Sequence, residues 1–413
     1  ANNFIDFLKH SRNYLIASVA TSSLAFVAIP VYTRLLSTED YGIVSVFMGV
    51  VSLVAPIMTL STDRAVSRYY FDKKSEYDFK IFVGTSVIAA SFFFLLVGIL
   101  LFLFAREFGE LVGLRKSIVY LIIPISALNV IGLILDQIYG PMQKSGMIAI
   151  SSVIRVFLGF ILSTALISVF YKDKIYGQIL GQIIAGLVIC FFWICYIKPY
   201  FKIKFLAIHL KYILRYCLPR IPYALSGVIL EQFGKFAISN QQSLSQAGFY
   251  TLALTISSIV SIVISVTHQA WNPYYFEYMN SKNYDKLDSE FIRILKITII
   301  VAFGVAAFGI DIGILLAKNT FTGYLHLIPI FTIGHVFNQI SYAYLRNFGY
   351  SKKIEYMTLA VIVSGIINLF LNLTLIRLFS ELGAALSFAL SYLILTIISF
   401  LLNHYFVKLH STS

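Results

Sequence analysis

The residues best suited to bind a ligand are the few ionisable side chains inside long apolar runs. Arg220, Glu231 and Lys235 share one such run. At about 100° per residue, the step from Arg220 to Glu231 returns nearly to the same helix face. Lys235 follows one turn later, where it and Glu231 can neutralise each other. Arg220 is then an unmatched cation, which predicts an anion site; a charge reaching back toward water after Pro219 is the alternative.

Asp136 and Arg155 form a second candidate pair. They lie at equal distances from a turn near Ser145 and Gly146, so an antiparallel helical hairpin brings them to the same depth. Opposite charges in an apolar environment are normally paired. We therefore expect a structural ion pair, with a direct role in ligand binding as the alternative.

Polar side chains also recur at helical spacing in four apolar runs. The stripes are Asn129, Asp136 and Gln143; Ser257, Ser261, Ser265 and His268; His335, Gln339, Tyr342 and Arg346; and Ser364, Asn368 and Asn372. Hydrogen bonds between helices explain such stripes, and we favour that explanation for the second and fourth. The stripe with His335 and Arg346 can equally bind sugar hydroxyls or phosphate. Neither histidine has a partner at metal-ligand spacing, so no metal site is predicted.

The composition indicates the environment of these residues. Of 413 residues, 59% are hydrophobic and 12% are charged, against about 45–50% and about 25% in soluble domains. Because so few charges cannot cover a water-facing surface, we predict an all-α integral membrane protein. About 20 apolar residues cross a bilayer, and twelve such runs begin near Tyr14, Gly42, Ile81, Ile118, Met147, Tyr176, Cys217, Ala247, Ile294, Gly323, Met357 and Gly383.

The connections between these runs are too short for a soluble catalytic domain, which needs roughly 50 residues. The segment from Gly227 to Lys235 lacks the spacing of a phosphate-binding loop. Asp72, Glu76 and Asp78 are interleaved with lysines, which favours a solvated loop over a transferase site. We therefore expect no enzyme, no cofactor and no on-board ATPase. The three cysteines fit small hydrophobic side chains rather than a disulfide or metal site.

The basic residues indicate the orientation. Most of the 32 Lys and Arg residues lie in the N-terminal arm, the even-numbered connections and the C-terminal tail. Cytoplasmic segments carry such an excess, so we predict cytoplasmic termini and no nucleic-acid binding. The run from Tyr14 to Tyr32 lacks a cleavage signature, so we expect it to be retained as the first helix.

The two halves of the chain resemble each other at an offset of about half its length. The matching segments are 5–9 with 211–215, 40–42 with 246–248, 68–71 with 273–276, and 176–178 with 382–384. Six spans per half make the repeats parallel, and transporters of this build hold their substrate between the halves. We predict two parallel six-helix bundles over 1–197 and 217–413, an inter-bundle cavity, and a basic cytoplasmic linker at 198–216.

The linker 198–216 mixes basic residues with Phe, Leu and Ile. The basic residues considered are Lys202, Lys204, His209 and Lys211. This mixture suits a helix that lies on anionic lipid headgroups. A solvated basic loop is the alternative.

Several short motifs are distributed over nearly the whole chain, at residues 29–36, 39–42, 218–222, 247–250, 368–369 and 382–385. In these motifs the chain resembles the multidrug/oligosaccharidyl-lipid/polysaccharide exporter superfamily. It is most similar to the polysaccharide-flippase branch, which includes the Wzx-type O-antigen flippases. The number of spans and the chain length agree with this resemblance.

The resemblance implies a flippase of the bacterial inner membrane that acts by alternating access. Its substrate would be an undecaprenyl-pyrophosphate-linked oligosaccharide, such as an O-antigen repeat unit for lipopolysaccharide biosynthesis, moved from the cytoplasmic to the periplasmic leaflet. Membrane lipids, a polymerase and other polysaccharide-assembly proteins are the implied partners. We expect a monomer, because one chain already contains both halves.

A pyrophosphate headgroup requires cationic ligands, and the fork of arginine fits phosphate best. We predict a cationic cavity without catalytic residues. Its substrate-binding residues would be Arg220, Lys235, Arg155, Arg34, Arg346 and His335. Their charge partners would be Asp136 and Glu231.

A multidrug or organic-cation extruder driven by a proton or sodium gradient is the main alternative. Relatives of that kind typically carry an acidic residue in the first helix, and the run from Tyr14 to Tyr32 contains none. Flippases of peptidoglycan precursors usually have fourteen helices, against the twelve predicted here. Neither a pore loop nor a ring of identical charges indicates a channel.

Overall fold

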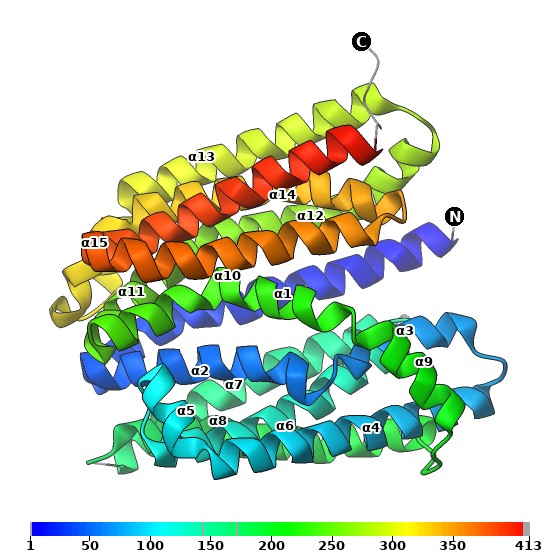
Figure 1. Cartoon of the computed structure of the whole chain (residues 1–413), viewed down its shortest axis with the longest axis horizontal. Coiled ribbons are helices and arrows are strands. Elements are labelled where there is room, and N and C mark those ends of the chain that lie inside the picture. Colours follow the sequence, from blue (N-terminus) through cyan, green and yellow to red (C-terminus); the bar gives the residue numbers. More distant parts are fainter. Residues whose placement is uncertain (1, 143, 171, 408–413) are drawn as a thin grey trace. The chain divides into compact units, whose positions relative to one another are not determined.

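The protein is mostly helical over the residues that its computed structural model describes, 2–142, 144–170 and 172–407, and these residues form no strand (Figure 1). The long helices are α1 (Asn2–Leu35), α2 (Thr38–Met58), α4 (Glu76–Leu103), α6 (Lys116–Tyr139), α7 (Ser145–Val169), α8 (Lys174–Ile197), α10 (Arg220–Gln241), α11 (Leu244–Ser257), α12 (Ile259–Asn280), α13 (Tyr284–Leu316), α14 (Ile328–Tyr350) and α15 (Ile354–Leu402). The short helices are α3 (Thr62–Asp72), α5 (Ala105–Val112) and α9 (Ala207–Cys217), with 3-10 turns at Lys198–Tyr200 and Asn319–Leu327 and a π-turn at Asn403–Val407.

The described helices confirm the all-α membrane architecture. By length and apolar composition, 8 of them can cross a membrane, and the bent pair α11–α12 raises this to 9. Helices α10 and α14, with 22 and 23 residues, are long enough to cross but are less apolar, because they carry polar stripes. With α15 taken as two crossings, these helices correspond to the twelve predicted runs.

Helix α15 is long enough to cross the membrane twice. Its 49 residues would extend roughly 74 Å as one straight helix, more than twice the hydrocarbon core. Ser380 interrupts it with a φ of 52°. Asn368 Nδ2 donates to Ser391 Oγ at 2.9 Å, which shows that the two parts fold back on each other (orange and red in Figure 1). A β-carbon at Gly383 would lie 2.0 Å from the carbonyl oxygen of Leu375, so this turn needs glycine.

Contacts divide the chain into two compact units. Unit 1 comprises Ala1–Leu24 and Ile43–Leu225, and unit 2 comprises Ala25–Gly42 and Ser226–Ser413. The boundaries fall inside α1, α2 and α10. Helix α9, in the segment expected to link the bundles, packs on α3 and α4 in unit 1. The division into 1–197, 198–216 and 217–413 stays a prediction.

The starts of α2 and α11 cross in unit 2 at two glycines. A β-carbon at Gly42 would lie 1.8 Å from the carbonyl oxygen of Leu244, and one at Gly248 would lie 2.7 Å from that of Thr38. Thr38 Oγ1 also donates to Ser245 Oγ at 3.2 Å. Gly42 and Gly248 are paired by the internal repeat, so the two repeats meet here through equivalent positions.

A bend of 42° separates α11 from the first part of α12. The hydroxyl groups of Thr255, Ser257 and Ser258 all donate to carbonyl oxygens three or four residues earlier. Such bonds compete with the backbone ladder of a helix and often bend it. Both α11 and α12 pack on α14, and this packing positions the site described next.

Candidate functional site

The polar stripes predicted on the eighth and tenth spans face each other in unit 2. His335 Nδ1 lies 2.8 Å from Ser261 Oγ, and its Nε2 lies 3.3 Å from Ser257 Oγ. Further along the same helices, His268 Nε2 lies 2.8 Å from Gln339 Oε1. The two stripes therefore form one polar seam between α11–α12 and α14.

The His335 end of this seam has its hydrogen bonds satisfied. Both ring nitrogens face a hydroxyl group, and the residue is only 6% exposed. Polar side chains commonly join membrane helices in this way. The arrangement supports a structural role next to the bend at Ser258. Ligand binding by His335 stays a prediction.

Arg346 occupies the other end of the seam. Its guanidinium carbon lies 4.6 Å from the ring centre of Trp271 and 5.0 Å from that of Tyr275, and one of its nitrogens contacts His268 Nδ1. Tyr275 in turn donates its hydroxyl hydrogen to Asn347 Oδ1 at 2.5 Å. Aromatic faces attract cations. No described carboxylate forms an ion pair with Arg346, so its charge is not neutralised within the seam.

The hydrogen bonds around Arg346 have a defined direction. Arginine can only donate, so His268 accepts at Nδ1 and is neutral. The proton of His268 is then on Nε2, which donates to Gln339 Oε1. The amide nitrogen of Gln339 keeps both of its hydrogens for another acceptor. We call His268, Trp271, Gln339 and Arg346 the donor cluster.

Three buried nitrogens of the donor cluster have no hydrogen-bond partner among the described residues. They are Arg346 Nη1, Gln339 Nε2 and Trp271 Nε1. A buried donor without a partner costs about 1–3 kcal/mol, so native proteins keep few of them without a reason. All three nitrogens are donors and one belongs to a cation. The cluster thus suits a ligand rich in hydrogen-bond acceptors, such as a phosphate, whose oxygens accept, or a sugar, whose hydroxyl oxygens can accept.

Arg155 in unit 1 has different surroundings. Its Nη1 donates to Asn129 Oδ1 at 3.4 Å, and its guanidinium lies 5.8 Å from the ring centre of Trp193. Asp136 is near enough for its charge to act on Arg155. This placement of opposite charges on α6 and α7 supports the structural pair expected from the hairpin, although the pairing itself stays a prediction.

Two other predicted cations belong to α10. Arg220 is the first residue of α10, in unit 1, and its guanidinium lies 5.5 Å from the ring centre of Tyr216. Lys235, in unit 2, donates from Nζ to Gln232 Oε1 at 2.7 Å, and the charge of Glu231 acts on it. Lys235 thus forms a hydrogen bond with an amide and also interacts with the charge of Glu231, the carboxylate predicted as its partner.

Arg34 lies near the end of α1 and is bound by backbone carbonyl groups. Its Nη1 donates to Pro30 O at 2.7 Å and to Leu316 O at 3.4 Å. Next to it, Thr33 Oγ1 accepts a hydrogen bond from the backbone of Lys318 at 3.2 Å. These bonds attach the end of α1 to the end of α13 within unit 2.

Trp271 and Tyr275 are not among the residues that the sequence pattern predicted for this site. They follow His268 by three and seven residues, so they lie on the same face of α12. Their side chains combine a flat apolar surface with one polar group. If the polar stripe of α12 is extended beyond His268 to include amphipathic aromatic residues, it contains both Trp271 and Tyr275.

Known proteins resemble this chain in both sequence and fold. A family model described as polysaccharide biosynthesis protein matches residues 7–279. Protein 1 of the Lsg locus of Haemophilus influenzae is 26% identical over 280 residues, which cover 66% of this chain and 67% of that protein.

Two solved structures share the fold at low sequence identity. An inward-facing MATE family multidrug resistance transporter of the MOP superfamily has a TM-score of 0.73 at 15% identity, over 99% of both chains. The lipid II flippase MurJ, in an inward closed conformation, has a TM-score of 0.72 at 14% identity, over 95% of this chain and 87% of that one. The family match confirms the resemblance found in the sequence: the chain belongs to the polysaccharide biosynthesis protein family and is a multi-pass membrane protein with the fold of MOP superfamily transporters.

Proposed function

We propose that this protein is a flippase for an undecaprenyl-pyrophosphate-linked oligosaccharide, which it moves from the cytoplasmic to the periplasmic leaflet. The donor cluster is the observation that carries the proposal. Its unpaired nitrogens include a cationic one, and no described carboxylate pairs with it. Phosphate and sugar oxygens are acceptors, and the planar fork of arginine suits phosphate. A cationic drug would require a carboxylate at this position.

The proposed orientation gives the donor cluster a role at the start of transport. With both termini in the cytoplasm, α14 runs inward and Arg346 lies four residues before its last residue, Tyr350. The cluster is then close to the leaflet from which a lipid-linked glycan is loaded. Arg220, Lys235 and Arg34 are proposed as further cationic ligands along the pathway, whereas Arg155 is assigned to the structural pair with Asp136. The bacterial inner membrane is the proposed location.

Translocation in proteoliposomes tests this function. The substrates compared are a polyprenyl-pyrophosphate oligosaccharide and a lipophilic cationic dye, each with and without an imposed proton gradient. We expect the glycolipid to move and the dye not to. Movement of the dye alone would overturn the proposal and identify an organic-cation extruder.

A matched pair of variants links the activity to the cluster. Arg346→Gln should reduce glycolipid movement strongly. Arg293→Gln should not, because Arg293 is a surface residue of unit 2 that lies 3.7 Å from Glu290. Equal transport activity of the two variants would show that the donor cluster does not bind the headgroup.

A further inference from the structure

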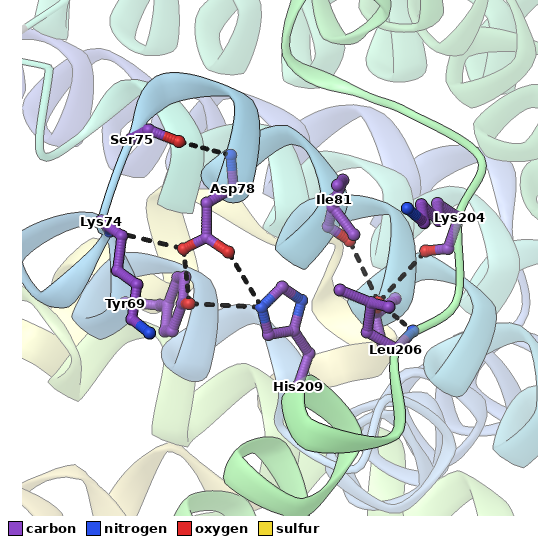
Figure 2. A network of polar contacts seen from close by, with 9 residues as sticks. Tyr69, Lys74, Ser75, Asp78, Ile81, Lys204, Leu206 and His209 are labelled. Carbon is purple, nitrogen blue, oxygen red and sulfur yellow. Dashed lines mark hydrogen bonds and ion pairs between the residues drawn. The ribbon is translucent and has the colours of Figure 1, made fainter.

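The segment after α8 is fixed to the start of α4 in unit 1 (Figure 2). The backbone nitrogen of Lys202 donates to the carbonyl oxygen of Lys80 at 3.2 Å. A β-carbon at Gly84 would lie 1.9 Å from the carbonyl oxygen of Lys202, so the segment can cross α4 only over a glycine. Thr85 Oγ1 bonds the carbonyl oxygen of Lys204 at 3.2 Å. These contacts hold the extended segment in a fixed register on α4.

A buried polar network fixes the following helix, α9, to the same place (Figure 2). His209 Nε2 lies 3.2 Å from Asp78 Oδ1, and the hydroxyl of Tyr69 donates to Asp78 Oδ2 at 2.7 Å. Burial, together with the bond to Asp78, raises the pKa of Tyr69. Burial and a bond to Asp72 likewise raise the pKa of Tyr212 to about 12. Both phenol groups therefore stay protonated and donate hydrogen bonds at physiological pH. Asp72 and Asp78 thus help to hold α9 in place, whereas the sequence predicted that they belong to a solvated loop.

The attached segment forms one wall of an open pocket of about 560 Å³. The pocket is lined by Tyr77, Lys80, Lys198, Pro199, Phe201 and Lys202. Lys202 Nζ donates to the hydroxyl of Tyr77 at 2.8 Å and lies 4.3 Å from the centre of its ring. The lining thus contains three lysines and a phenol but no carboxylate. Its charge favours an anion.

Large apolar side chains follow the pocket along the chain and point into the surroundings. Ile203 is 81% exposed, Phe205 is 50% exposed and Ile208 is 72% exposed. Lysines alternating with exposed apolar residues are typical of segments that lie in the headgroup region of a bilayer. A soluble anion would contact only the pocket, whereas a lipid would contact both the pocket and these apolar side chains.

We propose that the pocket lined by Lys80, Lys198 and Lys202 binds the phosphate headgroup of an anionic phospholipid. The acyl chains of the same lipid pack on Ile203 and Phe205. The bound lipid holds the start of α4 and the end of α8 at the membrane surface. This binding is independent of the transport proposed above, and it is measured directly as retained lipid.

Native mass spectrometry of the full chain tests the proposal. The protein is delipidated and then titrated with phosphatidylglycerol or phosphatidylcholine. The pocket variant combines Lys80→Gln, Lys198→Gln and Lys202→Gln. A lysine near an anionic surface contributes about a five-fold change in affinity, so we expect roughly 100-fold weaker phosphatidylglycerol binding and little change for phosphatidylcholine.

A matched control carries the same change in net charge at the start of α13 in unit 2. It combines Lys286→Gln, Arg293→Gln and Lys296→Gln. The corresponding pocket there is lined by Asp285, Asp288, Ser289, Ile292, Arg293 and Lys296, so carboxylates already balance its cations. The control should retain the phosphatidylglycerol affinity of the unmodified chain. An equal loss in both variants would overturn the proposal in favour of general charge attraction.

A second variant separates a lipid from a soluble anion and does not alter the pocket charges. Ile203→Ser with Phe205→Ser should weaken binding of intact phosphatidylglycerol while leaving binding of glycerol phosphate unchanged. Unchanged binding of intact lipid would contradict the proposed lipid contacts. Displacement of phosphatidylglycerol from the unmodified chain by millimolar inorganic phosphate would identify a soluble-anion site and overturn the proposal.

Discussion

Unit 1 and unit 2 each place an arginine against a tryptophan, yet the two sites differ in their charge. Arg155 faces Trp193, and a carboxylate, Asp136, acts on its charge. Arg346 faces Trp271, with a neutral histidine as its polar contact and no described carboxylate paired with it. A stack on an aromatic ring can hold an arginine in either case. A nearby carboxylate neutralises the positive charge within the protein. Without one, the charge can attract an anionic ligand.

The largest expected effect separates the two arginines by stability. Arg155→Gln removes the cation that Asp136 faces and leaves a carboxylate in an apolar environment. Breaking the predicted pair in this way should lower the free energy of unfolding by about 3 kcal/mol, measured by denaturation in detergent. Arg155→Lys, which keeps the charge, should lower the free energy of unfolding by less. Unchanged stability of Arg155→Gln would remove the structural interpretation of the pair.

Arg346→Gln should show the opposite pattern. We expect roughly 100-fold slower glycolipid transport, because a charge-assisted hydrogen bond to phosphate contributes about 1.5–3 kcal/mol. The free energy of unfolding should stay the same or rise, since a buried unpaired donor is removed. Transport in proteoliposomes and denaturation on the same preparation measure both quantities. A parallel loss of transport and stability would make Arg346 structural, as Arg155 is expected to be.

The charge swap Asp136→Arg with Arg155→Asp tests the pairing in unit 1. If the two residues act on each other, the double variant should recover about 1–2 kcal/mol of the stability lost by the single variants. Denaturation of the four proteins of this cycle gives the coupling free energy. Additive losses, with both single variants folded, would indicate separate roles.

The smallest expected effect concerns the two tryptophans. Trp271→Phe keeps the aromatic face below Arg346 but removes the unpaired Nε1 donor. One hydrogen bond of about 1 kcal/mol corresponds to roughly five-fold slower glycolipid transport. Trp193→Phe is the matched change in unit 1 and should leave transport unaltered. Equal transport by the two variants would show that Trp271 contributes only its ring.

Most of the architecture follows from apolar run length, because the thickness of a bilayer sets how many residues a crossing helix needs. The twelve predicted runs correspond to helices, including the two parts of α15. The bend at Ser258 was not predicted, although the closely spaced hydroxyl residues 255, 257 and 258, whose hydrogen bonds to the backbone favour such a bend, are visible in the sequence. Local hydrogen bonds thus carry information that hydropathy does not.

The candidate site was predicted in its parts but not in its assembly. The stripes containing His268 and Arg346 follow from helical spacing, whereas their mutual contact depends on how α12 packs against α14. For the same reason Asp78 was interpreted as a residue of a solvated loop, because its partner His209 lies 131 positions further along the chain. Spacing along one helix shows which side chains share a face, and only tertiary packing shows what they meet.

The glycine crossing of α2 and α11 also constrains how the two repeats can diverge. A side chain at Gly42 would collide with the backbone of the second repeat, and one at Gly248 would collide with the backbone of the first. A substitution at either glycine would therefore require the backbone of the other repeat to move. Elsewhere, duplicated halves can acquire separate sequences as their tasks separate. At this crossing each copy must keep its glycine.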